Sequence, residues 1–99
     1  MRRGTTPLQH FDVNVDLTGA EAVYVSYAQN CRVLVEREKA DVEITPTSVE
    51  FRLTQEESLK FRDDMGVLIQ IRARFPDGNA IASNEIKAKV EKILKEGVI

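Results

Sequence analysis

The sequence predicts an all-β domain in which two antiparallel sheets pack face to face as a sandwich. Apolar and polar residues alternate with a period of two in one segment after another, which is the pattern of strands buried on one face. Turn sequences separate these segments, and the most specific of them, Asp77-Gly78, is typical of a tight β-hairpin. The chain has 99 residues, of which 42% are hydrophobic and 30% charged, and this suits one globular domain.

The first strand is expected over residues 11–17, where Phe11 and Val13 alternate with Asp12 and Asn14. Such residues face a core and water in turn, because successive side chains of a strand point to opposite faces. Four further segments show the same alternation: 23–27, 32–36, 41–45 and 49–53.

The turns between these four segments agree with the alternation. A slip of one residue would move every apolar side chain to the solvent face, so residues paired across a turn must face the same side. A two-residue turn at 46–47 sets Ile44 opposite Val49, and a two-residue turn at 38–39 keeps the same parity. We therefore expect one antiparallel meander. The other expected pairs are Val35 with Val42 and, across a three-residue loop with Asn30 in the left-handed region, Tyr27 with Val33.

A short helix is expected after the fifth strand. Thr54 and Glu57 have the spacing of a capping box, in which each side chain accepts a hydrogen bond from the other residue's backbone amide. The helical turn would cover about residues 55–60 and place Leu59 or Phe61 under the sheets. It would also carry the chain across to the second sheet.

The last third of the chain is compatible with two structures. Ile86, Val90 and Leu94 follow a helical spacing, but Ile86 and Val90 also fit the alternation of a strand. The turn at 77–78 favours the strand, because pairing outward from it sets Ile69 opposite Ile86. The expected hairpin pairs 67–75 with 80–91, sets Val67 opposite Ala88 and Phe75 opposite Ala80, and leaves 92–99 as a tail or a short helical end; a helix within 84–96 is the alternative.

Seven short strands with one helical crossover indicate a two-layer, immunoglobulin-like antiparallel sandwich. The meander would form one sheet, and the final hairpin with the first strand would form the other. The likeness is architectural only, since the chain has one cysteine and no tryptophan. We expect a single domain over 1–99, with 1–7 as a flexible N-terminal segment and 92–99 as the tail.

No arrangement of residues indicates an active site, a cofactor or a metal centre. One histidine, His10, and one cysteine, Cys31, cannot complete a tetrahedral zinc site, and Cys31 has no neighbour in the sequence that would activate it as a nucleophile. The carboxylate pairs at 56–57 and 63–64 match no calcium loop. We therefore expect a protein that is not an enzyme and that binds neither cofactor nor metal.

Protein–protein contact is the function that the outward-facing residues favour. Exposed apolar side chains and the free edges of a small sandwich both offer binding surface to another chain. A net charge of −2 argues against a dedicated nucleic-acid binder. The alternative is a carbohydrate- or nucleic-acid-binding module, because the final hairpin carries several cations and Tyr24 could stack on a ring. The expected interaction surface comprises Tyr24, Leu68, Arg72, Arg74, Ile81, Lys87 and Lys89.

Membrane and export signals are not visible in the sequence. No apolar run is long enough to cross a bilayer, and no signal peptide follows Met1. A single cysteine suits a reducing compartment. We expect a protein that does not bind membranes and that folds in the cytoplasm.

Five segments share their character with one group of proteins: the start Met-Arg-Arg-Gly-Thr-Thr-Pro at 1–7, then 27–29, 53–57, 69–74 and 82–84. Together they resemble short prophage-encoded proteins from bacteriophages of Gram-positive bacteria, over nearly the whole chain. The opening segment is also similar to the N-terminal domain of phage baseplate upper proteins. The resemblance implies a β module of the tail or baseplate. Its partners would be other phage structural proteins or further copies of itself, first in the bacterial cytoplasm and then in the virion. It defines no catalytic residue, and this sequence lacks the long C-terminal part of a full baseplate protein.

Overall fold

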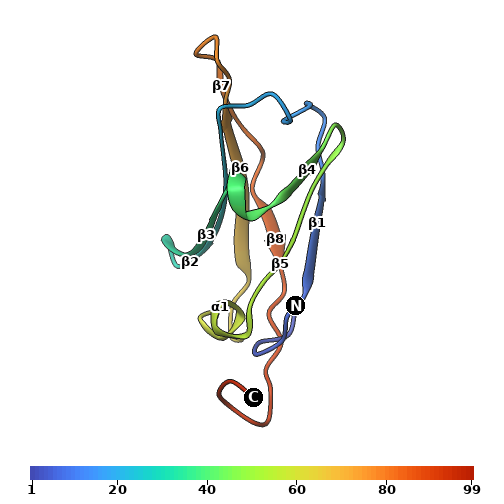
Figure 1. Ribbon diagram of the computed structural model, residues 1–99. Coiled ribbons are helices and arrows are strands. Elements are labelled where there is room, and N and C mark those ends of the chain that lie inside the picture. Colours follow the sequence, from blue (N-terminus) through green and yellow to red (C-terminus); the bar gives the residue numbers. More distant parts are fainter.

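The computed structural model describes residues 1–99 and shows two antiparallel sheets packed as a sandwich (Figure 1). The predicted two-layer all-β fold is therefore confirmed, with eight strands in place of seven. The smaller sheet has the order β1 (Leu8–Asp12), β5 (Ser48–Arg52) and β4 (Glu43–Thr45). The larger sheet has the order β3 (Arg32–Glu38), β2 (Ala22–Gln29), β6 (Val67–Arg74) and β7 (Ala80–Ala82), and β8 (Ile86–Ala88) also pairs with β6.

The core lies between the two sheets, where their alternating apolar residues meet. Tyr27 of β2 is fully buried and packs edge-on against Phe51 of β5, with ring centroids 6.2 Å apart. Phe61 stacks on the Tyr27 ring, with ring centroids 5.7 Å apart. The Tyr27 hydroxyl donates a hydrogen bond of 2.7 Å to Gln9 of β1, which satisfies the one polar atom of this aromatic cluster. Burial raises the pKa of Tyr27, so its hydroxyl stays neutral.

The predicted capping box and helical crossover are confirmed. The helix α1 (Gln55–Leu59) begins after Thr54, whose hydroxyl accepts a hydrogen bond of 3.1 Å from the Glu57 amide, while the Glu57 carboxylate accepts one of 2.9 Å from the Thr54 amide. The crossover joins β5 of the smaller sheet to β6 of the larger one. Phe61, 1% exposed, is the residue that it places in the core.

The predicted four-strand meander is wrong. The hairpins β2–β3 and β4–β5 both form, and Ile44 lies opposite Val49 as expected, but the two hairpins belong to different sheets. The 3-10 turn η1 (Lys39–Asp41) replaces the predicted two-residue turn and carries the chain from one sheet to the other. Val35 and Val42 therefore face the same interior from separate layers.

The β2–β3 hairpin has a two-residue turn rather than the predicted loop of three. Asn30 and Cys31 both have positive φ, 52° and 61°, as a type I′ turn requires. Tyr27 pairs with Val35 and not with Val33, and a bulge follows. The positive φ of Asn30 was predicted from the sequence, and the positive φ of Cys31 was not.

Two further strand predictions need correction. The first strand ends at Asp12, so residues 13–17 lie in a loop, and β1 pairs with β5 rather than with the final hairpin. The predicted strand 80–91 is interrupted and forms β7 and β8. Val67 lies opposite Ala88 and Ile69 opposite Ile86 as predicted, but Arg74 and not Phe75 lies opposite Ala80. The structure has no helix in 84–99, and no helix is long and apolar enough to cross a membrane.

Candidate interaction groove

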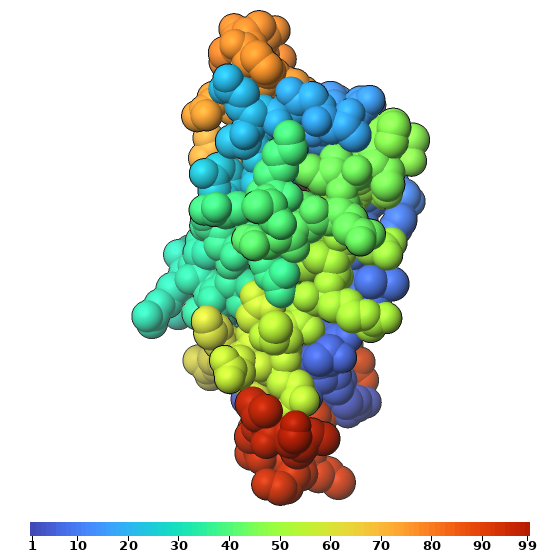
Figure 2. All heavy atoms as spheres, viewed as in Figure 1, coloured from blue at the N-terminus to red at the C-terminus, as the bar shows by residue number.

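One side of the sandwich is closed by a network centred on Arg37 of β3. Its guanidinium donates to both oxygens of Glu57 and, over 2.9 Å, to the carbonyl of Arg52. It also lies over the ring of Phe51 with 5.2 Å from its carbon to the ring centroid. Because these groups come from both sheets and from α1, the network joins the edge strand β3 to β5 and α1. Figure 2 shows this side, coloured green around residues 35–50, without an opening between the layers.

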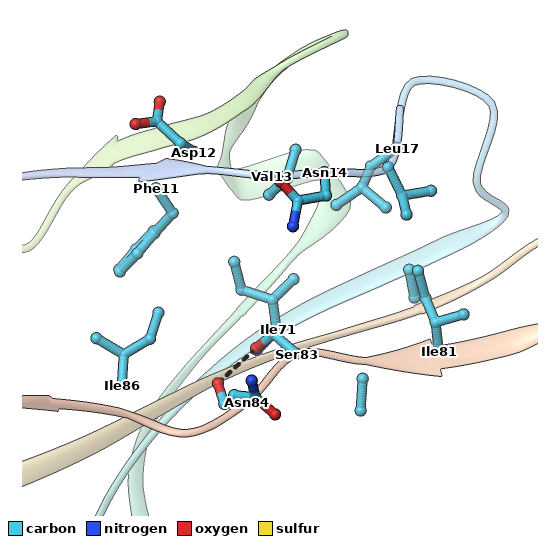
Figure 3. Close-up of a pocket in the computed structure, with 13 residues that line it drawn as sticks. Phe11, Asp12, Val13, Asn14, Leu17, Ile71, Ile81, Ser83, Asn84 and Ile86 are labelled. Carbon is cyan, nitrogen blue, oxygen red and sulfur yellow. Dashed lines mark hydrogen bonds between the residues drawn. The ribbon is translucent and has the colours of Figure 1, made fainter.

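The opposite side of the sandwich opens into an apolar groove. It has a volume of about 390 Å³ and lies between residues 11–17 on one wall and 81–86 on the other. Figure 3 shows Phe11 and Val13 pointing from the first wall toward Ile71 and Ile86, while Asp12 points away. The remaining apolar lining residues are Val15, Leu17, Ala73, Ile81 and Ala82.

The groove exists because two sheet edges face each other without a strand between them. β1 pairs only with β5, and β7 and β8 pair only with β6, so the second edge of each has no partner. Such an edge presents unpaired N–H and C=O groups. The apolar residues behind it stay partly accessible, with Val15 46% and Ile86 40% exposed.

One end of the groove is closed by the N-terminal residues. The Arg3 amide donates to the Glu91 carbonyl at 3.0 Å, and the Glu91 amide donates to the Met1 carbonyl at 2.7 Å. The terminal ammonium adds a bond of 2.8 Å to the Lys89 carbonyl. The N-terminal segment is thus joined to residues 89–91, which follow β8, whereas β1 has no hydrogen bonds to β7 or β8.

Ser83 forms the break between β7 and β8 on the second wall. Its amide donates to the Ile71 carbonyl at 2.8 Å, and its hydroxyl accepts from the Ile71 amide at 3.0 Å. The hydroxyl also donates to the Asn84 carbonyl at 3.0 Å. A side chain therefore takes the place of a backbone partner for β6, and the pairing register changes by one residue between β7 and β8.

The rim near β1 is acidic and carries the only histidine. His10 bonds through Nδ1 to Glu50 at 2.7 Å and through Nε2 to Asp12 at 3.0 Å. Hydrogen bonds to Glu50 and then to Asp12 raise the pKa of His10, since both favour the doubly protonated ring. At Asp16, hydrogen bonds from the Thr18 hydroxyl and amide lower the pKa of the carboxyl. No three His, Cys, Asp or Glu side chains are placed to bind one metal ion.

The structure divides the residues of the predicted interaction surface between the groove and the larger sheet. Ile81 lines the groove, and Lys87 and Lys89 line a shallow depression beside residues 63–66. The other four lie on β2 and β6, where Tyr24 pairs with Arg72 and Leu68 with Ala28. Tyr24 and Leu68 are each 39% exposed, and Arg74 pairs with Glu21 at 3.3 Å. Because Leu68 also lies opposite Lys87 of β8, Tyr24, Leu68, Arg72, Arg74 and Lys87 share the outer face of the larger sheet, whereas Ile81 lines the groove.

Most of the groove was missed because its residues carry the pattern of a core. Phe11, Val13 and Ile86 alternate as buried residues do, and nothing in the alternation shows that the layer opposite them is incomplete. The signal that was available is Asn84, a polar residue at an apolar position of the alternation, which interrupts the second wall. No known family model, curated protein sequence or solved structure matches the chain.

Proposed function

We propose that the chain is a small structural protein of a phage or prophage particle, in the tail or baseplate, that acts through protein–protein contacts. The observation that carries the proposal is the apolar groove between the unpaired edges of β1 and β7–β8. Apolar surface next to free backbone groups is a template for another polypeptide. The choice of a phage tail or baseplate as the assembly rests on the resemblance of the sequence to short prophage proteins.

The lining of the groove favours a polypeptide over a sugar or a nucleotide. Nine of the thirteen lining residues are hydrophobic, and none is a lysine or an arginine that could hold a phosphate. Its one aromatic ring, Phe11, lies 6.3 Å from Phe51 and belongs to the packed aromatic cluster rather than to an exposed stacking platform. Covering this lining removes apolar surface from water, which is the main driving force of protein association.

The proposal is tested on particles from the bacterium that encodes the chain. The prophage is induced, particles and assembly intermediates are separated by density and size, and mass spectrometry locates the chain among them. We expect the chain in particles or in intermediates larger than the free protein. A chain found only as a free monomer would contradict the proposal.

A second function has one observation in its favour, on the outer face of the larger sheet. Tyr24 is half-exposed beside Arg72, an arrangement suited to stacking on a base or a sugar. Glu38 lies on the other side of Tyr24, which weakens the attraction of this face for phosphate. Titration with labelled single-stranded DNA and with glycans tests this function, and it requires binding that Tyr24→Ala abolishes.

A further inference from the structure

We propose that the groove binds one extended segment of another protein, which enters as an added strand between β1 and β7–β8. The segment has apolar residues at alternate positions and lysine or arginine between them. This inference rests on the proposed role in protein–protein contact and names the chemistry of the partner.

The first argument is the alternation along the walls. Phe11 of β1 and two residues of the loop that follows it, Val13 and Val15, are spaced by two residues and line the groove together. A strand laid beside them would point every second side chain into the same space, because the side-chain period of a strand is two. The walls are six or seven residues long, and a segment of that length spans about 20 Å when extended.

The second argument is the unpaired backbone. An added strand can hydrogen-bond to the free edge of β1 or of β7–β8, and the interruption at Ser83 keeps each edge on the second wall to three residues. Such short edges pair weakly with copies of themselves. The site thus favours a segment whose side chains fit the apolar lining.

The third argument is charge. The walls 11–17 and 81–86 contain Asp12, Asp16 and Glu85 and no lysine or arginine, although the whole chain carries only −2. Of these carboxylates only Asp12 has a cationic neighbour, His10 at 3.0 Å. The Asp12 side chain is 92% exposed and points away from the lining. A bound segment would therefore have carboxylates beside its outward residues, which favours cations there.

The test uses two synthetic peptides of nine residues, both with valine and isoleucine at alternate positions. One has lysine at the positions between and the other has glutamate. Fluorescence anisotropy measures affinity, and amide chemical shifts of the labelled protein locate the site. We expect the lysine peptide to bind about tenfold more tightly, since each carboxylate near the rim contributes up to about fivefold. The shifts should fall in 8–17 and 80–88.

Matched variants separate the groove from the rest of the surface. Val15→Arg puts a cation and a long side chain in the groove and should lower the affinity for the lysine peptide about tenfold or more. Val33→Arg changes the same residue type at similar exposure, 53% against 46%, on β3 outside the groove, and should have no effect. Likewise Glu85→Lys should weaken binding about two- to fivefold, and Glu36→Lys should not.

Four results would overturn the proposal: no binding of the lysine peptide, equal binding of both peptides, shifts centred on Tyr24, or equal effects of the two valine variants. Self-association of the free chain that Val15→Arg abolishes would assign the groove to a second copy and would also overturn it. If the lysine peptide does not bind while the chain is present in particles, the inference about the partner segment is wrong and the proposed structural role is still supported. If the peptide binds as expected and the chain is absent from particles, the proposed structural role is wrong and the inference about the bound segment is still supported.

Discussion

Replacing Glu57 by glutamine should destabilise the fold in a way that depends on pH. Glu57 accepts hydrogen bonds from Arg37 at both carboxylate oxygens and from the Thr54 amide. The side chains of Arg37 and Glu57 are only 16% and 19% exposed. Glutamine keeps the size and one acceptor, so Glu57→Gln removes the charge and turns an amide group toward the guanidinium.

The expected decrease in the free energy of unfolding lies between the values for exposed and for fully buried ion pairs. Exposed ion pairs contribute about 0.2–1 kcal/mol, and breaking a fully buried pair costs about 3–5 kcal/mol. This pair is mostly covered and has two charge-assisted bonds, so we expect about 2 kcal/mol at pH 7. Burial raises the pKa of Glu57, but the bonds from Arg37 and Thr54 outweigh it and lower the pKa below its ordinary value of 4.5.

A carboxyl with a lowered pKa stabilises the fold above its unfolded value, and the contribution is lost as the pH falls through the folded pKa. The difference between wild type and Glu57→Gln should therefore be full at pH 7 and shrink below about pH 4.5. Urea unfolding followed by circular dichroism at pH 7 and at pH 3.5 measures it. Glu56→Gln is the control, because Glu56 is an exposed neighbour on the same helix. Equal losses in the two variants at pH 7, or a loss from Glu57→Gln that persists at pH 3.5, would refute the reasoning.

Three further outcomes are expected. Cys31→Gly should raise the free energy of unfolding by about 1 kcal/mol and Tm by about 5 °C, since glycine adopts the φ of 61° without a Cβ clash; Cys31→Ser keeps the Cβ, and an equal gain there would contradict this explanation. His10→Gln should destabilise the protein at pH 6 and have little effect at pH 9, because a raised pKa gives stability that is present below pH 6.5 and lost as the pH rises through the folded pKa; a pH-independent effect in urea unfolding would argue against it. Gln29→Leu should cost about 2–3 kcal/mol, because the buried amide makes three hydrogen bonds with Arg62 and Met65 backbone groups, and hydrogen exchange should rise at the Arg62 amide; unchanged exchange there would contradict this role.

The alternation predicted strand faces well and strand partners less well. Val35 and Val42 have the same parity in a meander and in a sandwich, because in both structures they face one interior. Parity therefore does not distinguish a neighbour in the same sheet from one in the opposite layer. In the observed arrangement, where the chain crosses at η1, Arg37 of the larger sheet contacts Arg52 of the smaller sheet and Glu57 of α1.

Local signals that involve few residues were predicted more completely. The capping box at Thr54 and a hairpin across Asp77-Gly78 depend on neighbours in the sequence, and both form, although the hairpin has three loop residues, 76–78, in place of the predicted two. The groove depends on which edges remain unpaired, and that is settled only when all eight strands are placed. Ile81 was the one member of the predicted surface that lines it.

The two sides of the sandwich also differ in when they can form. The Arg37 network joins residues 15 and 20 positions apart in the chain. The contacts at the end of the groove on the other side join Met1 to Lys89 and Arg2 to Glu91, 88 and 89 positions apart. Contacts between distant residues carry a larger loop-closure cost and form later. We expect the edge that runs from the N-terminus through β1, with β7 and β8, to fold last. In the native protein this edge should also open first, which would let a partner strand enter without unfolding the rest of the domain.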